Sequence, residues 1–161
     1  MNSTLLEPAS LTDSRNVYHL ILFSLVAKNA KERAKAKEKH LMSLNKAFDA
    51  SSNLNTHAAI VADASVLLLH TGHQAVAAWS VWHTGQYTED WKSNRLSTSD
   101  DTETAAIAGA FGTLADTVDP IHDMEEIHVF SDSTNAIKHS LDPSIHSAQC
   151  YALEILYTLT P

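Results

Sequence analysis

The spacing of hydrophobic positions divides the chain into parts of different character. Residues 1–12 show no period, so a loose N-terminus is predicted there. Over residues 13–50 the apolar residues recur at helical spacing, which predicts a helical lead-in. Its longest apolar run, Tyr18–Ala27, is shorter than the roughly 20 residues of a membrane span, and we interpret it as a buried helical segment. The polar stretch Ser51–Asn55 ends the helix and marks a boundary.

From residue 56 to residue 161 the pattern predicts one folded domain that begins with strands. Short apolar runs bounded by turn residues are typical of strands, and apolar positions three and four apart are typical of helices. The predicted elements are strands over His57–Val66, Gln74–Trp82 and part of Gln86–Leu96, a helix over about 100–117, a strand over Ile127–Ser131, and helices over Ser133–Ser140 and Pro143–Leu159. Short turns between the first three strands predict an antiparallel meander.

The fourth strand follows a crossover helix, so it is expected to run parallel to one strand of the meander through a right-handed connection. This order predicts an α/β fold with a mixed sheet. In such sheets the binding crevice lies at the carboxyl ends of neighbouring strands. Candidate chemistry is therefore expected where the first and fourth strands end.

Three acids lie at this predicted crevice. Asp63 stands within an apolar strand, where a carboxylate needs a hydrogen bond, a cation or a metal. Asp132 ends the fourth strand, and Glu103 heads the apolar stripe of the crossover helix. Each acid also has a purely structural interpretation. Asp63 would be a hydrogen-bonded strand-end residue, Asp132 an N-cap, and Glu103 one half of a capping box with Asp100 at the N-cap.

If the first and fourth strands are adjacent, Asp63, Glu103 and Asp132 form an all-oxygen pocket. Oxygen ligands suit Mg²⁺ or Mn²⁺ better than zinc. Such ions activate a water molecule and stabilise the attacking and leaving oxygens in phosphodiester hydrolysis. The three acids are therefore expected to be both the metal ligands and the catalytic residues of a hydrolase.

Three pieces of the sequence resemble the type 1 ribonuclease H domain of retroelement polyproteins, where it follows a reverse transcriptase. They are Val61-Ala62-Asp63-Ala64-Ser65, Glu103 early in the crossover helix, and Ser131-Asp132-Ser133-Thr134-Asn135-Ala136. The resemblance covers about residues 57–160. It implies a meander, a crossover helix and a parallel fourth strand. It also implies an endonuclease that uses Mg²⁺ or Mn²⁺ on the three acids to cleave the RNA strand of RNA:DNA hybrids.

The chain also departs from this family, whose members continue into a fifth strand and a last helix that supplies a fourth acid. Here the sequence stops at Pro161. This predicts a C-terminally truncated domain with weak activity or none. It also predicts an open edge on the fourth strand, through which the chain would self-associate unless its own residues 18–26 cover that edge. The alternative is a catalytically silent ribonuclease H-like module that binds nucleic acid or protein. Acids that converge on one solvent-reachable point would favour the enzyme.

The net charge of −8 is unevenly distributed, with +3 on residues 1–50 and −11 on the remainder. An acidic body suits metal ions, whereas a basic arm suits a polyanion such as nucleic acid. The basic residues also fit a simple solvated helix face. The only cysteine, Cys150, cannot form an internal disulfide, and no signal peptide or membrane span is predicted. An intracellular location, cytoplasmic or nuclear, is therefore expected rather than secretion.

The histidines and tryptophans add no clear motif. His70 and His73 are three residues apart on a turn and lack further ligands nearby. His139 and His146 follow the third acid in sequence and are interpreted as surface or helix-end residues. The large aromatic residues in or beside strands are interpreted as core or sheet-face residues rather than base-stacking ones; they are Trp79, Trp82 and Trp91.

Overall fold

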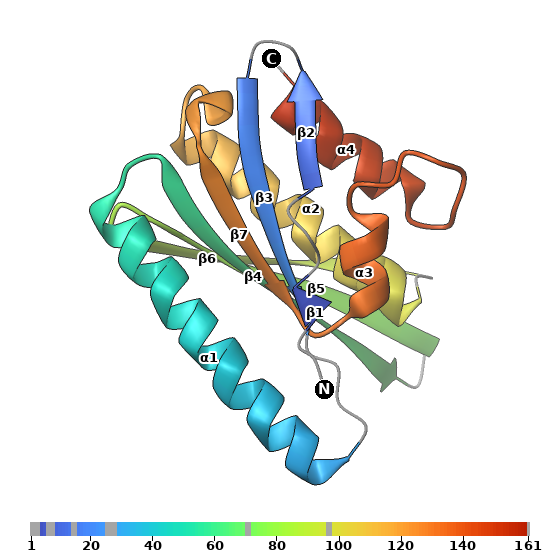
Figure 1. Ribbon diagram of the computed structural model, residues 1–161. Helices are drawn as coiled ribbons and strands as arrows, with labels where there is room; N and C mark the ends of the chain where they lie inside the picture. Colours follow the sequence, from blue (N-terminus) through green and yellow to red (C-terminus); the bar gives the residue numbers. More distant parts are fainter. Residues whose placement is uncertain are drawn as a thin grey trace.

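The computed structural model describes residues 4–5, 9–13, 16–24, 29–69, 72–95 and 98–160. Its elements in chain order are β1 (Thr4–Leu5), β2 (Ala9–Asp13), β3 (Asn16–Ser24), α1 (Ala30–Asn53), β4 (His57–Leu69), β5 (Gly72–His83), β6 (Gln86–Arg95), α2 (Ser99–Thr117), a 3-10 turn (Ile121–Asp123), β7 (Glu126–Ser131), α3 (Thr134–His139) and α4 (Gln149–Leu159). The described strands form one mixed sheet in the order β1-β3-β7-β4-β5-β6, and β2 also pairs with β3 (Figure 1). The predicted α/β class with a mixed sheet is confirmed.

The antiparallel meander of β4, β5 and β6 forms as the sequence predicts. The turn between β5 and β6 consists of Thr84 and Gly85, with φ angles of 51° and 74°. Positive φ at both central residues is the geometry of a two-residue hairpin turn that matches the twist of the strands. Glycine adopts it without a steric penalty, which explains the Gly85 position.

The fourth predicted strand, β7, lies beside β4 and runs parallel to it. Helix α2 connects β6 to β7 and packs against β4 and β5. The apolar side of the sheet that faces α2 includes Ile60 and Ile127, and the facing side of the helix includes Ile107 and Leu114, all fully buried. The predicted adjacency of the first and fourth strands is therefore confirmed.

The predicted helix over residues 13–50 begins only at Ala30, and residues 16–24 form strand β3 instead. A short apolar run fits a buried strand as well as a buried helix segment, and its spacing alone does not distinguish them. Parallel pairing with β7, from His19↔Glu126 to Ser24↔Ser131, gives this segment its strand structure. The prediction of a loose N-terminus over residues 1–12 is also wrong for residues 4–5 and 9–12, which pair with β3. Residues 1–3 and 6–8 lie outside the described residues.

The edge of β7 that was expected to be open is occupied by β3. This is the position that the resemblance gives to a fifth strand, and here a segment from the start of the sequence fills it. The prediction that residues 18–26 cover this edge is correct for residues 19–24, but they do so as a parallel strand rather than a helix, and residues 25–26 lie outside the described residues. Self-association through an exposed fourth-strand edge therefore loses its structural basis.

Helix α1 covers part of the opposite face of the sheet (Figure 1). Its inward residue Ala47 packs with Ala59 and Phe130 in a second, smaller buried cluster. Within the described part of the chain, every helix is too short or too polar to cross a bilayer.

The region after β7 differs in one detail from the prediction. The last helix begins at Gln149 rather than at Pro143. The preceding loop is held by local hydrogen bonds, from Ser144 N to Asp142 Oδ1 (2.9 Å) and from Ala148 N to His146 Nδ1 (3.1 Å). Such side-chain bonds to the backbone compete with helix formation.

Candidate metal centre

The pairing of β4 with β7 brings the first and third predicted acids to one edge of the sheet. The parallel ladder between the two strands ends at Val61 and Phe130. Asp63 and Asp132 each lie two residues beyond this last pair. Because the strands are parallel and adjacent, equal offsets place both acids at the same carboxyl edge. This is the crevice position expected for ligands in such sheets.

Glu103 reaches the same place from near the start of α2 (Ser99–Thr117). The N-cap of this helix is Thr98, so the capping box with Asp100 at the N-cap is wrong. Glu103 is 5% exposed, and its Oε1 accepts a hydrogen bond from the backbone N–H of Ala64 (3.1 Å). The same N–H lies 2.9 Å from Asp63 Oδ1. One backbone donor thus holds two of the three carboxylates together.

The three acids converge: one oxygen each of Asp63, Glu103 and Asp132 lies within 4.8 Å of the other two. Asp63 and Asp132 are exposed, Glu103 is buried, and a hollow of about 490 Å³ opens above them. Opposite oxygens around one Mg²⁺ are about 4.2 Å apart. Small side-chain rotations would therefore let all three bind one ion. The residues fit a hard divalent cation.

The electrostatics of this centre favour a cation. The pKa of Glu103 is raised to about 7, first by burial of the carboxyl group and then by the negative charges of Asp132 and Asp63. Hydrogen bonds from Ala64 N–H and Ser131 Oγ (3.5 Å) oppose the shift without cancelling it. Near neutral pH the metal-free centre therefore takes up a proton at Glu103. A bound divalent cation would displace that proton.

A fourth acid, Asp100, also lines the hollow, and the sequence interpretation had assigned it to helix capping alone. Its Oδ2 accepts a hydrogen bond from Asn135 Nδ2 (2.9 Å) and its Oδ1 accepts one from Ser133 Oγ (3.3 Å). These bonds tie the first turn of α2 to the first turn of α3, immediately after Asp132. The sequence signal that could have identified Asp100 is its spacing: it lies three residues before Glu103, on the same face of the helix.

Helix α1 brings a histidine close to the centre. The ring of His40 packs edge-on against Phe130 at 5.2 Å between centroids. Burial lowers the pKa of His40, and the nearby charge of Asp132 partly opposes this shift. The sequence does not predict this contact, because the basic residues around His40 fit a solvated helix face. The inward spacing of Ala36, His40 and Ala47 is the signal that could have shown it.

The other predicted histidines lie outside this centre or outside the described side chains. His139 and His146 stack on each other at 4.5 Å between ring centroids, and His146 Nε2 lies 2.9 Å from Asp142 O. His70 is outside the described residues, as is the side chain of His73.

The tryptophans divide between core and surface. Trp79 is 8% exposed and donates a hydrogen bond from Nε1 to Thr113 Oγ1 (2.8 Å). Trp82 packs beside Phe48 of α1, at 5.5 Å between ring centroids. The interpretation as core or sheet-face residues is confirmed for these two. Trp91 is 65% exposed and lies on the open part of the sheet.

Comparisons with protein-family models, curated proteins and solved structures found no match for this chain. The functional assignment therefore depends on the geometry and chemistry of the site.

Proposed function

We propose that this protein is a divalent-metal-dependent endonuclease of the ribonuclease H type that hydrolyses the RNA strand of RNA:DNA hybrids. The observation that carries the proposal is the convergence of Asp63, Glu103 and Asp132 from β4, α2 and β7 on one solvent-reachable point. The order of meander, crossover helix and parallel strand is also the one that the resemblance implies. A silent module has no need for three mutually repelling carboxylates at an open edge.

The acids of the centre would bind the metal ion from two sides, one buried and one exposed to substrate. When bound, Mg²⁺ or Mn²⁺ would supply an activated water molecule and charge stabilisation of the phosphodiester. Glu103 would bind it from the buried side, oriented by Ala64 N–H and Ser131 Oγ. Asp63 and Asp132 are exposed and would bind it from the side that faces substrate. Asp100 and Asn135 hold the starts of α2 and α3 together and so keep Glu103 and Asp132 in position.

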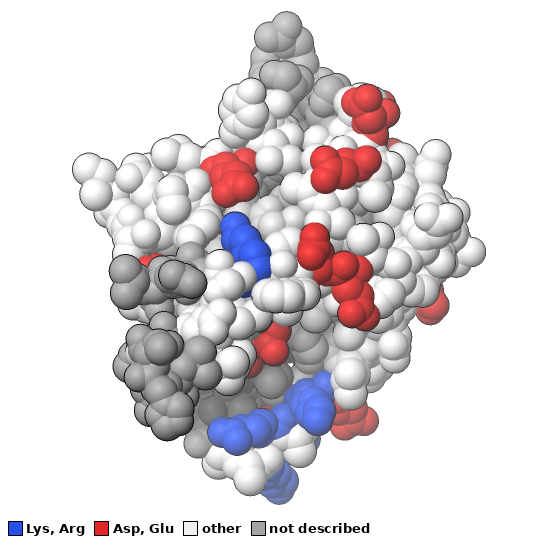
Figure 2. Space-filling view, turned by 180° about the vertical axis from the view of Figure 1, so that it is seen from behind, with Lys and Arg blue, Asp and Glu red and all other residues white. Residues whose placement is uncertain are grey.

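The charge of α1 supports a nucleic-acid substrate. Five basic side chains of its first turns are exposed: Lys31, Arg33, Lys35, Lys37 and Lys39. Figure 2 shows most of the visible Lys and Arg side chains at the lower end of the molecule, where α1 begins in Figure 1. The negative charge of Asp132 opposes the lowering of the pKa of His40, which belongs to the same helix. Helix α1 therefore also lies near the acids. A basic helix beside a metal centre is suited to hold a phosphate backbone there.

The deciding experiment is cleavage of a short RNA:DNA hybrid, labelled on the RNA strand, with Mg²⁺ and separately with Mn²⁺. We expect the full chain to cut the RNA strand and to leave single-stranded DNA intact. Asp132→Asn and Glu103→Gln should each lower cleavage by about 100-fold or more, because each removes a metal-binding oxygen or its charge. Asp116→Asn changes an exposed acid on the same helix and is the matched control. Metal binding without cleavage of the hybrid would instead establish the silent module.

A further inference from the structure

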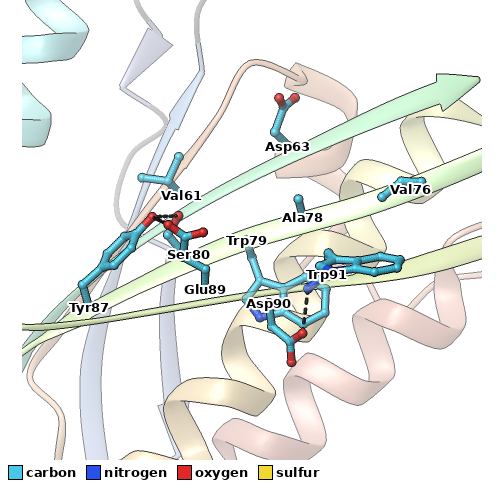
Figure 3. Close-up of a pocket in the computed structure, with 10 residues that line it drawn as sticks. All are labelled: Val61, Asp63, Val76, Ala78, Trp79, Ser80, Tyr87, Glu89, Asp90 and Trp91. Atoms are coloured by element: carbon cyan, nitrogen blue, oxygen red, sulfur yellow. Dashed lines mark hydrogen bonds between the residues drawn. The ribbon is translucent and has the colours of Figure 1, made fainter.

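Part of the sheet face that carries α1 is left uncovered. The helix packs over Ala59 and Phe130, while the adjoining surface of β5 and β6 lies open. A hollow of about 710 Å³ lies there, and Val61, Val76 and Ala78 form its apolar floor (Figure 3). Two large aromatic side chains of β6 border it.

The aromatic side chains are Trp91, 65% exposed, and Tyr87, 51% exposed. The hydroxyl of Tyr87 donates a hydrogen bond to Glu89, which holds the ring in place (Figure 3). Together with the apolar floor they form a contiguous patch rather than isolated exposed side chains. Such patches on soluble domains mark interaction sites.

The negative charge of the hollow favours a positively charged ligand. Three acids line it, namely Asp63, Glu89 and Asp90, and none of its lining residues is Lys, Arg or His. Asp63 also belongs to the metal centre, whereas Glu89 and Asp90 lie outside it, and a phosphate group would be repelled from the part of the hollow that these two acids line. A cationic side chain would be attracted both by the carboxylates and by the faces of Trp91 and Tyr87. The hollow therefore differs from the basic face of α1, which suits nucleic acid.

The edge of β6 adds a second means of binding. Among the described residues β6 pairs with β5 only and is the last strand of the sheet. One of its outer backbone groups, the N–H of Trp91, already donates to Asp90 Oδ1 (2.8 Å). The remaining outer N–H and C=O groups are available to an added strand. Alternation along β6 directs Tyr87, Glu89 and Trp91 to the same face, the face of the hollow. A strand added at this edge would place every second side chain over the hollow.

We propose that the β6 edge and its hollow bind an extended peptide segment that carries Lys or Arg at alternate positions. Backbone pairing with β6 would hold the segment, and its cationic side chains would lie against Trp91 and Glu89. A second copy of this chain does not offer that segment from its most basic region, because that region is helix α1. The occupant is therefore a basic segment of another protein. This proposal goes beyond the nuclease and does not depend on it.

The test is titration of the full-length protein with a short peptide that alternates Lys with Val and Thr, by calorimetry and by amide hydrogen exchange. We expect saturable binding that weakens with added salt, together with slower exchange of the β6 amides. Trp91→Ala and Glu89→Gln should each weaken binding about threefold to tenfold. Tyr157→Ala removes an aromatic side chain that is 86% exposed on α4 and should leave binding unchanged.

The proposal is overturned if the same peptide with Glu in place of Lys binds equally well. It is also overturned if both hollow variants bind the Lys peptide like the wild type. Asp132→Asn separates this proposal from the nuclease, because Asp132 does not line the hollow. That variant should lose metal binding and keep peptide binding, whichever way the cleavage assay turns out.

Discussion

The two ends of the β4–β7 pair each carry a cluster of ionisable side chains, but the clusters differ in charge balance. At the carboxyl end three carboxylates converge with no cationic partner among them. At the amino end Glu126 Oε2 lies 3.3 Å from His57 Nε2 and 3.0 Å from His128 Nε2. The same two strands thus hold one cluster whose charges repel and one whose groups satisfy each other.

This difference indicates which end is suited to bind an ion. An acid between two imidazoles already has hydrogen-bond donors, and burial lowers the pKa of His128 while Glu126 opposes that shift. The amino-end cluster therefore needs no added cation. At the carboxyl end, burial and then the charges of Asp132 and Asp63 raise the pKa of Glu103 to about 7, so part of the negative charge of this cluster is lost unless a cation binds. Perturbed groups in an open hollow are the better functional candidates.

The largest expected effect is the difference in hybrid cleavage between a variant at the carboxyl end of β7 and a variant near its amino end. Asp132→Asn should lower hybrid cleavage by about 100-fold or more, since loss even of residues that support metal ligands costs about 10- to 100-fold. Glu126→Gln changes an acid near the other end of the strand and should leave the rate within about twofold of wild type. Equal losses in the two variants would contradict the contrast between the clusters.

Metal-linked stability is the next largest effect. A divalent ion at one hundred times its Kd should stabilise the fold by about 2.7 kcal/mol, seen as a rise in melting temperature with Mg²⁺ or Mn²⁺. Asp63→Asn should blunt this rise because it removes one ligand charge. Glu126→Gln should show the same metal-dependent rise in melting temperature as the wild type. If Asp63→Asn responds to metal like the wild type, Asp63 does not belong to the centre.

The pH dependence of the metal-free protein tests the raised pKa of Glu103. The folded-state pKa of Glu103, about 7, is above its unfolded value of 4.5, so the folded state binds more protons between these values. This group's contribution to stability therefore falls as pH rises from about 4.5 to about 7. Glu103→Gln should remove that loss and raise the melting temperature of the metal-free protein in mildly alkaline buffer. Urea unfolding across this range would show the difference, and an unchanged pH profile in the variant would contradict it.

The smallest expected effect is a change in stability from a variant at the amino end of the β4–β7 pair. Because the pKa of His128 is lowered in the fold, the unfolded state binds more protons as pH falls below about 6.5, and stability decreases there. Glu126→Gln removes the group that opposes this shift. The variant should therefore lose about 0.2 to 1 kcal/mol relative to wild type in mildly acidic buffer, and less above neutral pH. A larger loss at high pH would show that Glu126 acts through packing instead.

Most of the second half of the molecule could be predicted from the sequence because its signals are local. The meander, the crossover helix and β7 follow from alternation, helical spacing and turn residues between His57 and Ser131. The convergence of Asp63, Glu103 and Asp132 followed from one topological rule, that a strand after a crossover helix runs parallel to its neighbour. The sequence therefore identifies the three acids without any information on the distances between them.

The sequence by itself thus determined the strands and the crossover helix from β4 to β7 and the three acids of the candidate metal centre. Only the tertiary structure decided that residues 16–24 form a strand, because their hydrogen bonds go to β7, more than a hundred positions away in the chain. It also decided the contacts of His40 with Phe130 and of Asp100 with Asn135. The spacing of apolar residues along one segment indicates which face of that segment is buried, but it does not indicate which distant segment covers that face.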